Sequence, residues 1–230
     1  MRILALDTAT EACSAALLID STLIERYAEL ERGHSEHILA MIDAVLNEGG
    51  LTLSGVDAIA FGRGPGAFTG VRLAAAVAQG LAFGAGRPVC PVSDLRALAQ
   101  RVLSAETEAG AVLVCSDARM HEVYWGVYVR DAHGLAAALG PERVSPAQTV
   151  RLPQGTPTPV WGAGRGFRAY PELAARLGGE LEGIQQTVLP RAREIAQLAA
   201  VAVRQGELVT AEQALPVYLR DDVARPPSQD

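Results

Sequence analysis

Short apolar runs alternate with polar turns and amphipathic stretches along the first half of the chain. The runs have the length of strands and predict strands at 1–6, 13–19, 23–30, 56–61 and 88–92. Stretches with apolar positions three and four residues apart predict helices over 35–48, 71–84 and 93–104. Ser35 and Ser93 are suited to cap two of these helices. This order of elements favours an α/β fold in which helices cover a mixed sheet.

The pattern begins again in the second half. Further strands are predicted at 111–115 and 123–129. Asp7 precedes Asp20 by 13 residues, and Asp117 precedes Asp131 by 14, so each half opens with an acid-terminated strand and a hairpin. We therefore predict that one unit is duplicated along the chain.

The duplication divides the chain into two mixed-sheet subdomains with flanking helices, at 1–106 and 107–230. The second subdomain is the degenerate one, because prolines punctuate 140–159 and leave a loop-rich stretch. A last helix is predicted at 191–204, and it could pack back on the first subdomain. The tail 221–230 is expected to fray.

The composition, with 49% hydrophobic and 20% charged residues, is that of a folded domain and excludes a disordered chain. Twenty basic and 26 acidic residues give a net charge of −6, so the average field does not attract nucleic acid. All the basic residues are arginines. The absence of lysine excludes a P-loop and any mechanism that uses a lysine nucleophile.

Features of the chain that bear on its location favour a reduced, cytoplasmic protein. Cys13, Cys90 and Cys115 lie among apolar neighbours without metal-binding spacing, and we expect buried thiols. The first apolar run ends at Asp7, which is unlike a signal peptide. The alanine-rich stretch 73–79 is too short to span a membrane, so no membrane partner is expected.

Asp7 and Asp117 end equivalent strands of the two predicted units. Carboxylates at such strand ends could face each other across a cleft and hold a metal-bound phosphate, as in the actin, Hsp70 and sugar-kinase ATPases. The alternative is that each carboxylate only caps its own turn. Neither Asp7-Thr8-Ala9 nor Asp117-Ala118-Arg119 has the glycine that close phosphate contact needs. We interpret Asp7, Thr8 and Asp117 as vestigial phosphate loops, which argues against a competent ATPase.

A glycine-rich loop at 62–70 is the most distinctive segment of the chain. It lies between a predicted strand and a predicted helix, which is the geometry of an anion site at a helix N-terminus. Thr69 is suited to cap the helix at Val71, and plain turn chemistry is the alternative reading. A second glycine-rich turn, 162–166, is either a remnant of such a site or an ordinary loop. The candidates for a nucleotide-proximal loop are Gly62, Arg63, Gly64, Gly66, Thr69, Gly70 and Arg72.

The helix predicted at 71–84 has no apparent polar face, because Arg72 and Gln79 are its strongly polar residues. Such a helix is either buried on all sides or covered by a partner, and we favour a partner. Together with the helix at 35–48 it supplies the candidate partner or dimer interface: Ile38, Ile42, Val71, Ala74, Ala75, Ala78 and Ala82.

No catalytic constellation or metal site is predicted. His34 and His37 lie three residues apart and could share a helix face, but no third ligand is evident. There is no nucleophile elbow and no convincing serine, histidine and aspartate arrangement. We therefore predict no catalytic residue, no metal and no cofactor.

Four segments together resemble the TsaB family, also called YeaZ, over essentially the whole chain. They are Ile3–Thr10 (ILALDTAT), His34–His37 (HSEH), Gly62–Arg72 (GRGPGAFTGVR) and Pro216–Arg220 (PVYLR). The resemblance implies an actin-like duplicated fold and a role in making threonylcarbamoyladenosine next to the anticodon of ANN-decoding tRNAs. It also implies that this chain is an inactive paralogue of TsaD, which is the transferase. TsaD and the TsaB protein form a complex, and a further protein, TsaE, joins it as an ATPase. Family members pair through N-terminal helices, as homodimers or with TsaD, and meet tRNA only through the complex.

The residues agree with a non-catalytic role. TsaD relatives hold a metal with a His-x-x-x-His pair on a helix, whereas this chain has His34 and His37 at a different spacing. Members of the family, like the paralogue TsaD, have also been called glycoproteases. The residues of this chain give that activity no catalytic support. An inactive actin-like scaffold and an ATP-dependent small-molecule kinase remain the two readings, and the scaffold is favoured.

Overall fold

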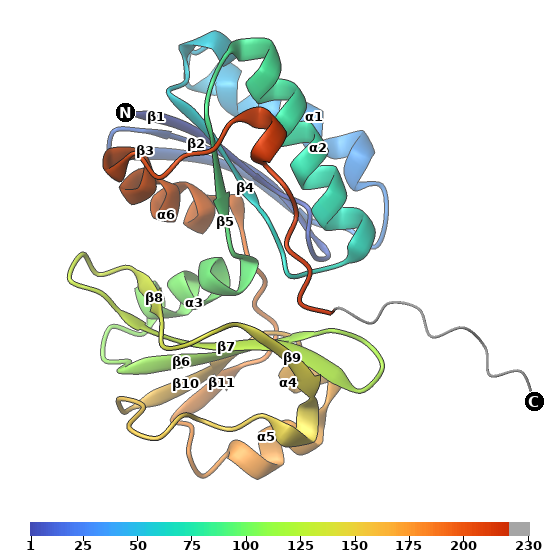
Figure 1. Cartoon of the computed structure of the whole chain (residues 1–230), viewed down its shortest axis with the longest axis vertical. Helices are drawn as coiled ribbons and strands as arrows, with labels where there is room; N and C mark the ends of the chain where they lie inside the picture. The colour runs from blue at the N-terminus through green and yellow to red at the C-terminus, as the bar shows by residue number, and fades with distance from the viewer. Residues whose placement is uncertain (221–230) are drawn as a thin grey trace, which may run out of the picture.

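The computed structural model describes residues 1–220, so the expectation for the tail 221–230 lies outside the described residues. The chain forms two units, each built around one mixed β-sheet (Figure 1). In the first sheet the strand order is β3-β2-β1-β4-β5. The strands are β1 (Arg2–Asp7), β2 (Ala12–Ile19), β3 (Thr22–Glu29), β4 (Ala58–Gly62) and β5 (Val89–Val92).

The second sheet repeats this arrangement, with the order β11-β10-β6-β7-β8 and with β9 also paired to β7. Its strands are β6 (Ala111–Asp117), β7 (Glu122–Arg130), β8 (Ala136–Ala138), β9 (Arg143–Pro146), β10 (Val160–Ala163) and β11 (Gly183–Gln185). In each sheet the central strand, β1 or β6, pairs antiparallel with the next strand along the chain, β2 or β7, and parallel with its other neighbour, β4 or β10. The matching order and directions confirm the duplicated, actin-like fold.

Helices cover both faces of each sheet. They are α1 (His34–Glu48), α2 (Phe68–Ala85), α3 (Asp94–Ala105), α4 (Gly166–Ala169), α5 (Pro171–Leu177) and α6 (Ala192–Gln205), with short 3-10 turns at Leu53–Gly55, Ala147–Thr149 and Ala211–Gln213. Figure 1 shows α1 and α2 over the outer face of the first sheet, α6 and α3 between the sheets, and α5 on the far face of the second. In the described part of the chain, buried apolar side chains form four clusters, one between each face of a sheet and the helices that cover it.

The two helices that lie between the sheets, α3 and α6, each pack on the sheet formed by the other half of the chain. Helix α3 belongs to the first part of the sequence, but it packs on β6, β7, β8 and β10 of the second sheet. Helix α6 comes from the last part and packs on β1, β2, β4 and β5 of the first. The position of α6 agrees with the expectation that the last helix could pack back on the first subdomain, whereas α3 was not expected on the second sheet. The division at residue 106 itself stays a prediction.

Helix boundaries differ from the predicted ones at two N-termini. Helix α1 starts at His34, after Gly33 in the left-handed conformation at φ 87°, so Ser35 is not its cap. Helix α2 starts at Phe68, so Thr69 lies in its first turn and does not cap it. The Ser93 cap is confirmed, because its hydroxyl accepts a hydrogen bond from the Arg96 amide. The three cysteines are free and buried, as predicted.

Helix α2 is long and apolar enough to cross a membrane, by length and composition alone, in the part of the chain that the structure describes. The helix packs instead on β4, with a row of alanines toward the sheet. An alanine-rich core helix passes the same test, which makes this weak evidence for a membrane span.

Candidate functional site

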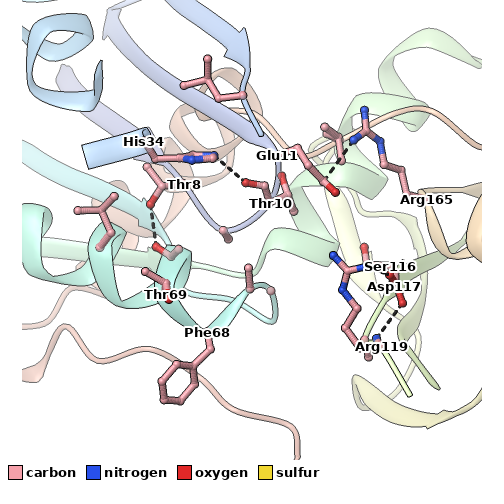
Figure 2. A pocket seen from close by; sticks show the side chains of 18 of the residues that line it. Thr8, Thr10, Glu11, His34, Phe68, Thr69, Ser116, Asp117, Arg119 and Arg165 are labelled. Carbon is pink, nitrogen blue, oxygen red and sulfur yellow. Dashed lines mark hydrogen bonds and ion pairs between the residues drawn. The ribbon is translucent and has the colours of Figure 1, made fainter. Parts of the chain in front are cut away.

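A cleft of about 680 Å³ lies where the ends of β1 and β6 approach each other. The first unit supplies the β1–β2 turn, the start of α1 and the start of α2. The second unit supplies the residues that follow β6 and the turn after β10 (Figure 2). In a duplicated fold of this class, such a cleft is the place where a ligand would bind between the units.

The glycine-rich loop closes against the β1–β2 turn. The Ala67 amide donates a 2.7 Å hydrogen bond to the Ala9 carbonyl, and the Thr8 hydroxyl donates one of 2.7 Å to the Gly70 carbonyl (Figure 2). A Cβ at Gly66 would lie 2.4 Å from the Ala9 carbonyl oxygen, and one at Gly70 would lie 2.1 Å from that of Thr8. The glycines thus allow two protein loops to touch, and the Ala67 amide at the start of α2 is bonded to protein and not free for an anion.

The second unit repeats this closure. A Cβ at Gly164 would lie 2.5 Å from the Cys115 carbonyl oxygen, and one at Gly166 would lie 2.7 Å from the same atom. In both units, glycines in the loop after a central strand pack on the backbone of the neighbouring strand or its turn. Close packing therefore accounts for the glycines at 162–166 without a nucleotide.

Asp7 and Asp117 do not face each other across the cleft, so the first of the two arrangements that the sequence left open is not found. Asp7 is fully buried beneath the cleft, and its Oδ1 accepts a hydrogen bond of 2.8 Å from the Ala9 amide. Burial raises the pKa of this carboxyl to about 6. Asp117 does line the cleft, where it accepts hydrogen bonds from the Arg119 amide and the Tyr170 hydroxyl. The turn-capping interpretation is the one that these contacts support.

An ion-pair network joins the two units along one wall of the cleft. Arg165 of the second unit contacts Glu11 of the first unit at 3.3 Å (Figure 2). It also pairs with Glu29 of the first unit. The His34 ring lies 2.9 Å from the Thr10 carbonyl oxygen, which fixes the start of α1 against the β1–β2 turn. The ion pairs of Arg165 thus link the two units at this wall, whereas the His34 contact lies within the first unit.

Residues 214–220 cross from the first unit to the second as a C-terminal strap (Figure 1). Its Val217 amide donates to the Arg63 carbonyl at 2.7 Å. Its Arg220 donates to the Ala118 carbonyl at 3.0 Å and pairs with Glu122. The strap therefore ties the glycine-rich loop to the residues that follow β6.

Arg72 does not line the cleft, although it belonged to the candidate nucleotide-proximal loop. Its guanidinium lies 3.2 Å from the centroid of the Phe68 ring and 5.3 Å from that of Tyr218. The side chain is thus held between one ring of α2 and one ring of the C-terminal strap. Of the same candidates, Gly66, Thr69 and Gly70 do line the cleft.

The histidines of the candidate metal pair bind backbone atoms separately. The His37 Nδ1 lies 3.1 Å from the Gly33 carbonyl oxygen, and because this oxygen can only accept, Nδ1 donates the hydrogen bond. Among residues 1–220, no group of three or more histidine, cysteine or acidic side chains is placed to hold a metal ion.

The predicted interface residues lie in the core of the first unit, which corrects the interface proposed from the sequence. Each of them is at most 4% exposed: Ile38, Ile42, Val71, Ala74, Ala75, Ala78 and Ala82. They face β-strands of their own unit because the alanine side of α2 packs on β4. These side chains are not accessible to a partner.

A different side of α2 is exposed and largely apolar. Phe68 is 57% exposed and Phe83 is 77% exposed, and between them lie exposed Arg72, Ala76 and Gly80. The spacing is close to four residues, so these positions form one stripe along the helix. Sequence reasoning missed the stripe because apolar residues surround this helix on all sides. The large phenylalanines among small residues were the signal that could have found it.

Comparisons with known proteins identify the family. Residues 28–227 match the family described as TsaD, tRNA N6-adenosine threonylcarbamoyltransferase. The tRNA threonylcarbamoyladenosine biosynthesis protein TsaB of Escherichia coli is 40% identical over 225 residues, covering 97% of this chain and 96% of that protein. The protein of the same description from Haemophilus influenzae is 40% identical over 233 residues, covering 97% and 95%. The chain belongs to the TsaB family.

Solved structures agree with membership in the TsaB family, also called YeaZ. YeaZ from Pseudomonas aeruginosa superposes with a TM-score of 0.86 at 46% identity, covering 95% of this chain and 99% of that one. A second P. aeruginosa structure, described as similar to peptidase YeaZ, gives a TM-score of 0.85 at the same identity and coverage. The resemblance noted from the four sequence segments is thereby confirmed, as is involvement in threonylcarbamoyladenosine biosynthesis.

Proposed function

We propose that this chain is a non-catalytic partner that activates TsaD in the threonylcarbamoyladenosine modification of tRNA. One observation carries the non-catalytic part: the loops that would grip a phosphate are closed on each other. The Ala67 amide donates to the Ala9 carbonyl, and Gly66 and Gly70 let the glycine-rich loop pack directly on the β1–β2 turn, so this amide is not free to bind a phosphate. Family membership supports the pathway.

The modified base is the adenosine next to the anticodon of ANN-decoding tRNAs, and the reaction takes place in the cytoplasm. In this proposal TsaD transfers the threonylcarbamoyl group, and TsaE joins the complex as its ATPase. This chain meets tRNA within the complex and needs no cofactor or metal of its own. Protease activity is not part of the proposal.

The surface proposed for TsaD is the exposed stripe of α2, together with the adjoining outer side of α1. Exposed Phe68 and Phe83 offer apolar area at the ends of the stripe, and Ala76 and Gly80 allow close approach of another helix. In α1, Leu39 is 52% exposed. In the absence of TsaD the same face forms a homodimer, so the homodimer and the TsaD heterodimer should exclude each other.

The decisive experiment reconstitutes modification from TsaD, TsaE, an enzyme that supplies threonylcarbamoyl-adenylate, tRNA and this chain. We expect modified adenosine only when this chain is present, and no transfer by this chain alone. Sedimentation of the same mixtures should show the homodimer replaced by a one-to-one complex with TsaD. If TsaD binds while the homodimer persists, the shared surface is wrong.

The rival kinase function is tested on the isolated chain. Calorimetry with ATP and magnesium should show no binding, and hydrolysis should not exceed the background. ATP turnover that is lost in Asp117→Asn, a variant of a cleft-lining residue, would overturn the non-catalytic proposal and favour a small-molecule kinase.

A further inference from the structure

The second unit carries a separate pocket of about 300 Å³ on the sheet face opposite to α3. The floor consists of Trp125 and Val127 of β7, and the walls come from residues between 139 and 153. The Trp125 indole is held in place, because its Nε1–H donates a 3.0 Å hydrogen bond to the Ser145 hydroxyl. We refer to this site as the Trp125 pocket.

The charge of the Trp125 pocket is opposite to that of the protein. Two exposed arginines, Arg143 and Arg151, line it, and no acidic residue does. The Arg143 guanidinium lies 5.5 Å from the centroid of the Trp125 ring. Neither arginine makes an ion pair within residues 1–220, whereas Arg165 in the cleft pairs with two glutamates. Free guanidinium groups beside an apolar floor favour a ligand that is both anionic and flat.

We propose that the Trp125 pocket binds a nucleotide of single-stranded RNA. The arginines hold the phosphate, since guanidinium groups match phosphate geometry. The base lies against the Arg143 guanidinium and the apolar wall at Leu152 and Pro153, in the manner of stacking sites for single strands. The volume of the Trp125 pocket is at the small end of the range for ligand sites. The pocket therefore suits one nucleotide and not a folded domain.

The choice of RNA rests on the proposed role in tRNA modification, while the anionic, flat character of the ligand rests on the pocket alone. The pocket is also remote from the stripe of α2, because β7 and β9 lie in the other unit (Figure 1). RNA and a protein partner on α2 could therefore be bound at the same time. The proposal thus assigns RNA binding to the residues between 139 and 153 that form the walls of the Trp125 pocket.

The test uses the fluorescence of Trp125 in the full chain. The protein has two tryptophans, so Trp161→Phe leaves Trp125 as the single reporter. A short single-stranded RNA should change the emission of this variant at low ionic strength, and labelled RNA should bind by anisotropy. Each neutralised phosphate of a single strand contributes about 0.7 to the dependence of log affinity on log salt. Because both arginines hold one phosphate, Arg143→Gln with Arg151→Gln should reduce the slope by about 0.7.

Arg168→Gln is the matched control, because Arg168 is an exposed arginine of the same unit outside the pocket. It should retain both the affinity and the salt slope. RNA binding without a Trp125 response, or with unchanged affinity in the double variant, would overturn the site. A response to AMP equal to that for RNA would indicate a free-nucleotide site, and a response to polyglutamate alone would indicate an acidic protein segment; either would overturn the RNA proposal. Because the isolated chain is used, these results stand whether or not TsaD is activated.

Discussion

Asp7 and Asp94 bury their carboxyl groups beside each other beneath Gly62. A Cβ at Gly62 would lie 2.6 Å from Oδ1 of Asp7 and 2.3 Å from Oδ1 of Asp94. Both side chains are at most 2% exposed, and Asp94 Oδ2 accepts a hydrogen bond from the Gly64 amide. Two buried carboxyls this close cannot both be ionised, so the pair retains a proton. The last strand residue of β1 is thereby tied to the first turn of α3.

This shared proton predicts that stability decreases as the pH rises. Burial raises the pKa of Asp7 from 3.8 to about 6, and burial followed by the nearby Asp7 charge raises that of Asp94 well above its usual value, with Glu142 adding to the shift. The unfolded chain releases these protons near pH 4, whereas the folded chain keeps them longer. The free energy of unfolding should therefore fall between pH 4 and 6 by up to about 1.4 kcal/mol per pH unit for each proton.

Asp94→Asn should reduce that pH dependence, because an amide can donate to Asp7 and still accept from Gly64. Denaturant unfolding across pH 4–8 measures the effect, and the variant should be the more stable protein at pH 8. Asp43→Asn, on the exposed side of α1, serves as the control and should follow the parent curve. An unchanged slope in Asp94→Asn would mean that the pair does not hold the proton.

Gly70→Ala should destabilise the protein, since its Cβ would lie 2.1 Å from the Thr8 carbonyl oxygen. Overpacking of this kind costs about 1–3 kcal/mol, which a lower thermal midpoint would report. Gly80→Ala is the matched control on the same helix, with nothing within 4 Å of the added atom. It should stabilise by about 0.5–1 kcal/mol through helix propensity. Equal midpoints for both variants would contradict the closed-loop interpretation.

Ala76→Glu should weaken association while leaving the fold intact, because Ala76 is exposed on the stripe of α2. We expect at least a tenfold loss of affinity for TsaD, or about 1.4 kcal/mol, by sedimentation or calorimetry. Ala78→Glu, two positions along, puts a charge into the core and should unfold the protein. If Ala76→Glu forms the same complex with unaltered affinity, the stripe is not the docking surface.

Apolar runs and helix periodicity were sufficient to predict the order of elements through the first half of the chain. The strands β1 to β5 and helices α1 to α3 lie within a few residues of their expected positions. Strands β8 and β9 were not predicted, because both are too short to show a period and β9 lies within the proline-punctuated stretch 140–159. The duplication was readable because the first strand of each half ends at an aspartate and the second is followed by one.

The direction of a helix face and the partners of distant side chains could not be predicted. Helix α2 is apolar on all sides, so its sequence does not tell which side meets the sheet; contact with β4 decides it. Arg165 and Glu29 are 136 positions apart, and no local pattern links them. The same holds for Asp7 and Asp94, whose pairing depends on how β1 and α3 pack.

The exchange of α3 and α6 makes the two halves of the chain interdependent. A fragment ending at residue 106 would lack α6 and leave one face of its sheet, including Ile3 and Leu18, open to water. The complementary fragment would lack α3, which covers Val112 and Val114. Neither fragment is a transplantable module, and a split at this point would give two insoluble pieces that regain structure by complementation when mixed. The ancestral duplication has thus become one cooperative folding unit.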